Sequence, residues 1–243
     1  MTWLDHLLAA VLVVGLPLLG AFTYRALLAA LAQGQPRARL REYWQTIALE
    51  WSLVAAVLVV WRAAGRSAAD LGLAVPDGRA TLVGAALTLA ALIGLTWQWF
   101  VIKRLDETGR DRLREQLAGA AGMLPADEPE RRTFRLVAVT AGICEEILFR
   151  GFLIWYAATW IGPWPAAVVT SIAFGLGHLY QGRAGVIKTG LAGLVAGTLY
   201  VATGSLLWPI ILHVAIDLQG GAVGWLVGRP AQVGLSAPPP PDR

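Results

Sequence analysis

The apolar run at residues 134–156 contains three ionisable side chains within six positions. Two adjacent carboxylates, Glu145 and Glu146, are followed by the guanidinium of Arg150. The run is long enough to cross a bilayer, where an ionisable group is costly and usually marks a functional site. Any fold of this chain must therefore pair these charges or place them in a cavity.

Helical spacing separates the three charges into two sets. Glu146 and Arg150 stand at i and i+4 with the acid first, the favourable order for an ion pair on one helix face. Glu145 points about 100° away from Glu146, because a helix turns by that angle per residue. Arg150 can then neutralise Glu146 while Glu145 faces another group. The alternative is that all three charges only hold helices together.

The composition identifies an integral membrane protein. Of 243 residues, 56% are hydrophobic and 15% charged, the mean hydropathy is +0.58, and soluble domains average about 25% charged residues. The 11 Trp and 5 Tyr residues suit the two membrane interfaces. In such a chain the net charge of +4 indicates orientation in the bilayer, and we expect no nucleic-acid partner.

Seven apolar stretches predict an all-α, polytopic transmembrane helical bundle of about seven spans. They cover residues 7–31, 44–61, 80–102, 134–156, 163–180, 185–203 and 206–227. The first contains Pro17, which predicts a kink, and the second contains Glu50. No Lys or Arg precedes Arg25, so the first stretch is interpreted as a retained helix rather than a cleaved signal.

The spans divide into three predicted parts. Residues 1–133 would form N-terminal membrane helices and a cytoplasmic linker, 134–228 a membrane core of four helices that holds the polar residues, and 229–243 a proline-rich disordered tail. Within the linker, residues 103–117 are expected to form a surface helix that residues 125–132 interrupt.

Loop charges predict the orientation. Most Lys and Arg residues lie in the links after the first, third and fifth spans and in the tail, so these segments are expected to be cytoplasmic and the N-terminus outside. Ala-, Arg- and Gly-rich usage favours a bacterial plasma membrane.

Two of the three histidines lie in predicted spans. His178 follows Phe174 by four residues, and His213 precedes Asp217 by four, so each pair shares a helix face. His6, near the N-terminus, is interpreted as an interfacial residue without a chemical role.

Glu145, His178, His213 and Asp217 could converge in one cavity. A carboxylate beside an imidazole suits the activation of water, and a second imidazole suits the stabilisation of an oxyanion. The set Glu145, His178 and His213 also fits a two-histidine, one-carboxylate metal site, for which zinc is the expected ion. Both versions predict attack of water on a carbonyl.

Three motifs carry a resemblance to a known family. They are Glu145-Glu146-x-x-x-Arg150, Phe174-x-x-x-His178 and His213-x-x-x-Asp217. In this order they resemble the motifs of the CPBP intramembrane proteases, also called the CAAX-protease and bacteriocin-processing (Abi) family, which includes the type II prenyl-protein endopeptidases. The resemblance covers about residues 134–228 and implies that these four helices form the catalytic core.

The resemblance implies a role for each motif residue. Glu145 would be the water-activating base with His178 beside it, and His213 with Asp217 would stabilise the oxyanion. Glu146 with Arg150 would support the site. The last motif position is usually Asn or Asp, and an Asp donates a hydrogen bond only when protonated. The resemblance leaves open a metalloendopeptidase or a metal-free, glutamate-dependent mechanism.

The resemblance also implies a peptide or protein substrate reached from the lipid bilayer. A prenylated CAAX protein, a peptide to be matured and a bacteriocin-like peptide in self-immunity are equally compatible with these motifs. Two other function classes use the same buried Glu, His and Asp residues: a proton- or ion-coupled transporter and a non-catalytic scaffold.

Cys144 is the only cysteine, which excludes an intramolecular disulfide and a cysteine-cluster metal site. It would point about 100° away from Glu145 on a helix. We therefore interpret it as a small buried residue rather than a nucleophile.

Overall fold

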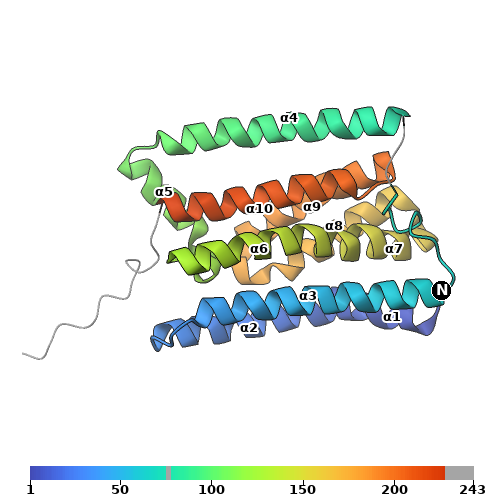
Figure 1. The fold of residues 1–243 in the computed structure, drawn as a ribbon, viewed down its shortest axis with the longest axis horizontal. Coiled ribbons are helices and arrows are strands. Elements are labelled where there is room, and N and C mark those ends of the chain that lie inside the picture. Colours follow the sequence, from blue (N-terminus) through green and yellow to red (C-terminus); the bar gives the residue numbers. More distant parts are fainter. Residues whose placement is uncertain (75–77, 228–243) are drawn as a thin grey trace, which may run out of the picture.

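The computed structural model describes residues 1–74 and 78–227, and all regular structure within these ranges is helical (Figure 1). The predicted disordered tail at 229–243 lies outside the described residues. The α-helices are α1 (Trp3–Ala10), α2 (Leu16–Ala32), α3 (Ala38–Ala63), α4 (Gly78–Lys103), α5 (Glu107–Leu117), α6 (Glu128–Glu145), α7 (Ile154–Ile161), α8 (Pro163–Gly177), α9 (Gly182–Thr203) and α10 (Leu207–Val227). Two π-helical segments, η1 (Val11–Gly15) and η3 (Glu146–Leu153), and two 3₁₀ turns, η2 (Ala118–Met123) and η4 (Leu179–Gln181), complete the described elements.

The long helices run along one axis, as expected for a polytopic membrane bundle (Figure 1). Five described segments are long and apolar enough to cross a membrane: Trp3–Ala32, Ala38–Ala63, Gly78–Lys103, Leu179–Thr203 and Leu207–Val227. The continuous helix α6–η3–α7 and the shorter apolar helix α8 share this axis. The predicted helical bundle is confirmed, with the number of spans approximate.

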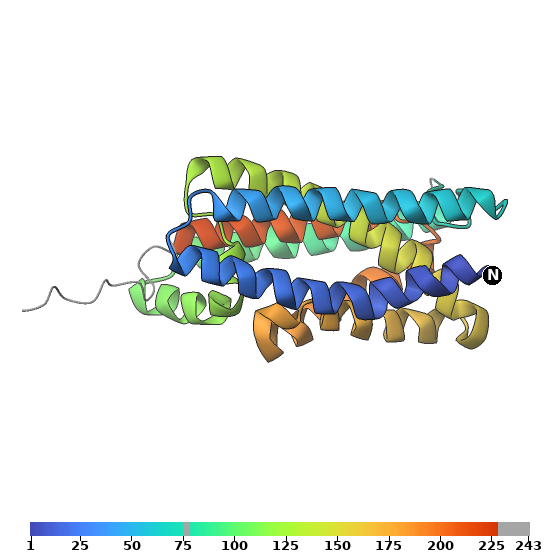
Figure 2. The ribbon, with the colours of Figure 1, turned by 90° about the horizontal axis from the view of Figure 1, so that it is seen from below.

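Helix packing places the first span across the bundle. Figure 2 shows α1–η1–α2 between α3 on one side and α8–α9 on the other, and α2 contacts both α3 and α8. Helix α6 packs against α3 and α10, and α8 packs against α9. The N-terminal helices therefore surround the segment that carries the three motifs.

Helix α4 lies at the edge of the bundle and contacts α10 (Figure 1). Most of its apolar side chains are exposed, among them Leu82, Leu87, Ile93 and Trp97. An apolar surface of this extent would promote association in water, whereas lipid tails solvate it. The exposure of α4 thus agrees with a membrane environment.

Pro17 changes the hydrogen bonding of the first span without ending it. A proline has no N–H to donate within the helix. The π-helical segment Val11–Gly15 immediately precedes α2, and backbone dihedrals stay helical through the junction. The π-helical turns before α2 accommodate the missing N–H donor of Pro17, which explains how one span can contain this proline.

The expected interruption at residues 125–132 is wrong in its second half. Helix α6 begins at Glu128, with Pro129 in its first turn. Pro is favoured there because the first N–H groups of a helix have no partner within it. Asp127 caps this end, since its side chain accepts a hydrogen bond of 2.8 Å from the backbone N–H of Glu130. Part of the predicted linker is thus the start of the motif-bearing helix.

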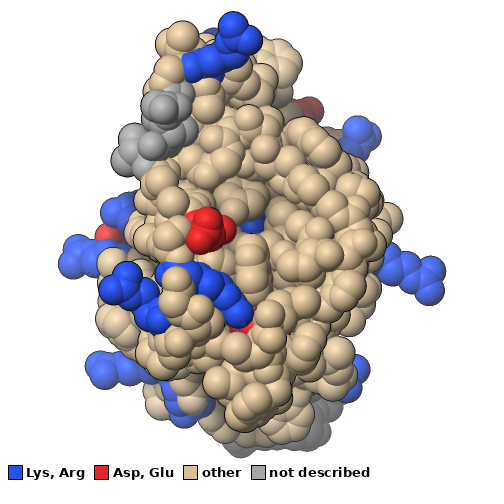
Figure 3. All heavy atoms as spheres, turned by 90° about the vertical axis from the view of Figure 1, so that its right-hand side faces the viewer, with Lys and Arg blue, Asp and Glu red and all other residues tan. Residues whose placement is uncertain are grey.

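The two ends of the bundle differ. One, the α5 end, contains the α2–α3 link, α5, η4 and the end of α10; the other, the Asp5 end, contains the N-terminus and the links that follow α3, α7 and α9. Figure 3 views the Asp5 end, whose surface is largely uncharged with charged side chains scattered over it.

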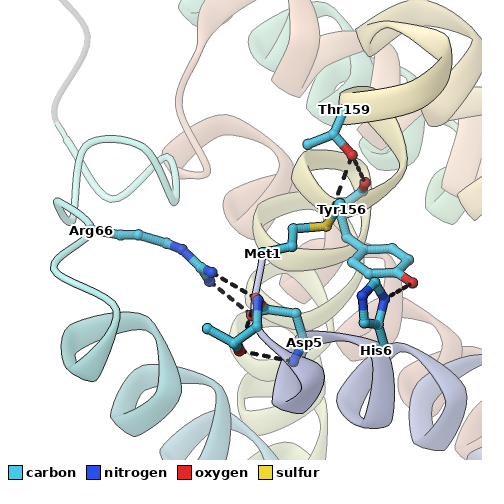
Figure 4. Close-up of polar contacts among 7 residues, drawn as sticks. Met1, Asp5, His6, Arg66, Tyr156 and Thr159 are labelled. Atoms are coloured by element: carbon cyan, nitrogen blue, oxygen red, sulfur yellow. Dashed lines mark hydrogen bonds and ion pairs between the residues drawn. The ribbon is translucent and has the colours of Figure 1, made fainter.

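At the Asp5 end, a buried ion pair fixes the N-terminus to the loop after α3 (Figure 4). Asp5 has no exposed side-chain surface and binds Arg66 with both oxygens, at 2.8 and 2.6 Å. The guanidinium also lies 4.2 Å from the ring centroid of Trp155. The neighbouring His6 contacts the hydroxyl of Tyr156 at 2.8 Å on an exposed surface. These contacts hold the first and fourth long helical segments together, far from the motif residues.

Candidate active site

Glu145 and Glu146 lie where the backbone of the central helix changes form. Helix α6 ends at Glu145, and the π-helical segment η3 begins at Glu146 and continues to Leu153. A π-helical segment inserts an extra residue per turn, which alters the direction of the side chains that follow, and such segments are frequent at functional sites. The sequence had predicted an ordinary helix here.

The predicted pairing of Glu146 with Arg150 is present. Their side chains are 0% and 3% exposed, and Oε1 of Glu146 lies 2.9 Å from Nη1 of Arg150. Because both charges are buried, each depends on the other for compensation. Arg150 also lies 4.2 Å from the ring centroid of Phe174, so the aromatic ring of the second motif packs on the charge of the first.

His213 connects the first and third motifs. Its Nδ1 lies 2.7 Å from Oε1 of Glu146. A carboxylate accepts hydrogen bonds only, so Nδ1 carries the proton of this contact and donates it. The other ring nitrogen, Nε2, lies 3.7 Å from Oε2 of Glu145 and 3.6 Å from Oδ2 of Asp217. Three carboxylates thus surround one imidazole.

His178 has a different environment. Its Nδ1 lies 2.9 Å from the backbone carbonyl oxygen of Phe174, one helical turn earlier. Its ring centroid lies 4.9 Å from that of Phe174 and 5.8 Å from that of Tyr180. The imidazole within 4 Å of Glu145 is therefore that of His213, whereas His178 directly follows α8 and also lines the cavity.

One cavity of about 690 Å³ unites the predicted residues. All seven residues of the three motifs line it: Glu145, Glu146, Arg150, Phe174, His178, His213 and Asp217. Its walls also come from α2, α3 and the segment after α5. Lining residues such as Glu42, Leu117 and Gln181 show that the cavity extends from the middle of the bundle to the α5 end.

Close helix packing shapes the back of this cavity. A Cβ atom on Gly193 of α9 would lie 3.0 Å from Phe174 and 3.1 Å from Arg150. Any larger residue at this position would displace the aromatic ring or the guanidinium. The glycine-rich sixth stretch therefore supports the site through its lack of side chains.

Two further side chains bear on the site. Glu50 of α3 lines the cavity, although the sequence alone did not connect it with the motifs. Its signal was a carboxylate within an apolar stretch, the same signal that marked Glu145. Cys144 is completely buried and is not among the residues that line the cavity, in agreement with its interpretation as a small core residue.

A zinc site would need three donors within about 2 Å of one point. Within residues 1–74 and 78–227, no three His, Cys, Asp or Glu side chains form such a group. The Nδ1 atoms of His178 and His213 are both engaged with protein oxygens, so only the Nε2 atoms face a ligand. The side chains as placed do not fit a metal, and the mechanism below uses none.

A family model matches the segment that contains all three motifs. Residues 132–219 match the Rce1-like family, described as type II CAAX prenyl endopeptidase Rce1-like. This segment belongs to the CAAX-protease family. No curated protein and no solved structure matches the chain. The match confirms the predicted family for this segment, which contains all three motifs.

Proposed function

We propose that the protein is an intramembrane endopeptidase in which Glu145 activates a water molecule to hydrolyse a peptide bond. One observation carries this assignment: Glu146 is fully buried between Arg150 and His213, whereas Glu145 lines the cavity and has no arginine partner among the described residues. A base must be free to take a proton, and a carboxylate held by a guanidinium is poorly suited to that task.

The remaining motif residues would complete the reaction. Glu145 takes one proton from water as the oxygen attacks the carbonyl carbon, and it later passes that proton to the leaving nitrogen. In its imidazolium form His213 donates through Nδ1 to Glu146 and through Nε2 toward the cavity, where it would stabilise the oxyanion. Asp217 complements the charge of this ring at 3.6 Å. His178, on the facing helix, would orient the water or the carbonyl.

The cavity supports a peptide substrate with apolar groups. Its walls include Leu19, Leu49, Phe134 and Ile216, which suit aliphatic side chains or a prenyl group. The family description names prenyl endopeptidases, so a prenylated CAAX sequence is the first substrate to test. Maturation of unprenylated peptides is the second, and the cavity is compatible with both.

Charge distribution supports cytoplasmic access to the site. The α5 end carries Arg37, Arg39, Arg41 and the basic residues of α5, whereas Arg62, Arg66 and Arg79 lie toward the Asp5 end. By the positive-inside rule the α5 end faces the cytoplasm. The cavity would then open on the side where cytoplasmic proteins reach the membrane.

Cleavage assays on purified protein test this proposal. Wild type and Glu145→Gln, reconstituted in lipid nanodiscs, are incubated with quenched farnesylated and unprenylated peptides, and thermal melts check folding. Glu115→Gln, the same change on the exposed face of α5 outside the cavity, is the matched control. We expect cleavage by wild type and Glu115→Gln, and none by Glu145→Gln.

Other outcomes have distinct meanings. Equal cleavage by wild type and Glu145→Gln would remove Glu145 as the base. Loss of cleavage on treatment with a chelator, with recovery on addition of zinc, would replace the metal-free mechanism by a metal-dependent one. Proton or ion flux without cleavage of any peptide would favour the transporter class. A phenotype that survives Glu145→Gln would favour the scaffold.

A further inference from the structure

Glu50 is a partly buried carboxylate that the motif chemistry does not use. It lies near the middle of α3, outside the segment that matches the family model. Its Oε2 atom is buried, and within residues 1–74 and 78–227 this atom has no hydrogen-bond partner. In the same ranges Glu50 forms no ion pair, in contrast to Glu146, which has Arg150.

Glu50 faces the reaction site. It lines the same cavity as Glu145, His213 and Asp217. Helix α3 packs directly against α6, which ends at Glu145. Glu50 and Glu145 both lie near the middle of their continuous helical segments, so they stand at a similar depth in the bundle.

The acidic groups of the cavity outnumber its cations. The cavity walls contain five carboxylates, those of Glu42, Glu50, Glu145, Glu146 and Asp217. The same walls contain two lysine or arginine side chains, Arg150 and Lys188. Arg150 is already committed to Glu146. A cleft lined by one sign of charge concentrates ligands of the opposite sign, and a buried charge without a partner favours a ligand that supplies one.

We infer that Glu50 forms a subsite for a cationic group of the substrate, so that the protein selects peptides with a basic residue beside the scissile bond. The inference rests on the proposed peptidase function for its biological meaning. A lysine or arginine side chain would place its charge against Glu50 while the peptide backbone passes Glu145. Binding would thereby provide the countercharge that the protein itself lacks at this position.

Binding and cleavage of matched peptides test the subsite. The probes are dansylated, farnesylated peptides of the Cys-aliphatic-aliphatic-Met type, in which Lys or the uncharged norleucine replaces each residue other than the cysteine in turn. Wild type, Glu50→Gln and the control Glu115→Gln are compared in nanodiscs. Glu115 lies on the exposed face of α5 and does not line the cavity.

We expect wild type and Glu115→Gln to bind the Lys peptide about tenfold more tightly than the norleucine peptide at one position, as for a desolvated charge pair. Glu50→Gln should lose this ratio. Glu50→Lys should reverse it in favour of a Glu-bearing peptide. Each ratio is measured within one preparation, so a partly unfolded variant does not alter it.

The inference is overturned if wild type shows no ratio at any position or if the ratio survives Glu50→Gln. The proposed function fails separately: selective binding without cleavage would leave the subsite intact and remove the peptidase. Cleavage without selective binding of the Lys peptide would support the peptidase and overturn the subsite.

Discussion

A single methyl group at Gly142 is predicted to disable the site without touching any motif residue. Gly142 lies on α6 three residues before Glu145, and it faces α10 next to His213. A Cβ atom at Gly142 would lie 2.9 Å from the backbone nitrogen and 3.1 Å from the Cα of Val214, whereas ordinary contacts are 3.4–4 Å. Gly142→Ala must therefore separate the two helices by about half an ångström or more.

The separation acts directly on the contact between His213 and Glu146. This hydrogen bond is 2.7 Å long, and the shift would bring it to the limit of about 3.2 Å at which such bonds weaken. Overpacking of this kind costs about 1–3 kcal/mol of stability. Misplacement of reacting groups by about 1 Å can cost about a hundredfold in rate, so we expect kcat/KM to fall by about 10- to 100-fold.

Single-turnover cleavage and thermal melts of Gly142→Ala measure both effects. The matched control is Gly94→Ala in α4, where a Cβ atom would meet nothing within 4 Å. Alanine favours a helix over glycine by about 0.5–1 kcal/mol, so the control should be at least as stable and as active as wild type. Wild-type activity in a folded Gly142→Ala variant would refute the reasoning, as would an equal loss in Gly94→Ala.

Three further changes separate structural from catalytic groups. Arg150→Met should destabilise the protein by about 3–5 kcal/mol and abolish cleavage, because Glu146 would remain buried without a guanidinium; denaturation in mild detergent and the peptide assay measure the two effects. Arg66→Met should destabilise the protein by a similar amount, about 3–5 kcal/mol, because Asp5 is fully buried. The kcat of the folded fraction should nevertheless stay at the wild-type value, since this pair lies at the end of the bundle away from the cavity. Cys144→Ala should keep cleavage activity, and thiol-blocking reagents should leave the wild-type rate unchanged, because the thiol is buried outside the cavity; a rate loss in either assay would contradict this assignment.

Local spacing predicted the parts of the site that lie within one helix. The i, i+4 rule predicted the pairing of Glu146 with Arg150 and placed His213 and Asp217 on one face, and both contacts are present. The apolar stretches predicted the helical bundle because a chain in lipid must satisfy its backbone groups internally. These predictions depend only on helix geometry, which the sequence specifies directly.

Contacts between helices could not be predicted in the same way. The family resemblance implied His178 as the imidazole beside Glu145, and that role remains a prediction. The short distances instead join His213 to both glutamates, through opposite nitrogens of its ring. This geometry depends on the π-helical segment after Glu145 and on the close approach of α6 and α10 at Gly142. Neither the π-helical segment nor this close approach can be predicted from the spacing of apolar and polar residues.

In the proposed peptidase, the two halves of the chain would contribute different parts of the site. The segment that matches the family supplies every motif residue, whereas α2, α3 and the segment after α5 supply much of the cavity wall. Reacting groups must keep one geometry to serve one reaction, but a wall residue needs only to suit the ligand that passes it. A charge on α3 can therefore change which peptides enter without altering how Glu145 and His213 meet the scissile bond.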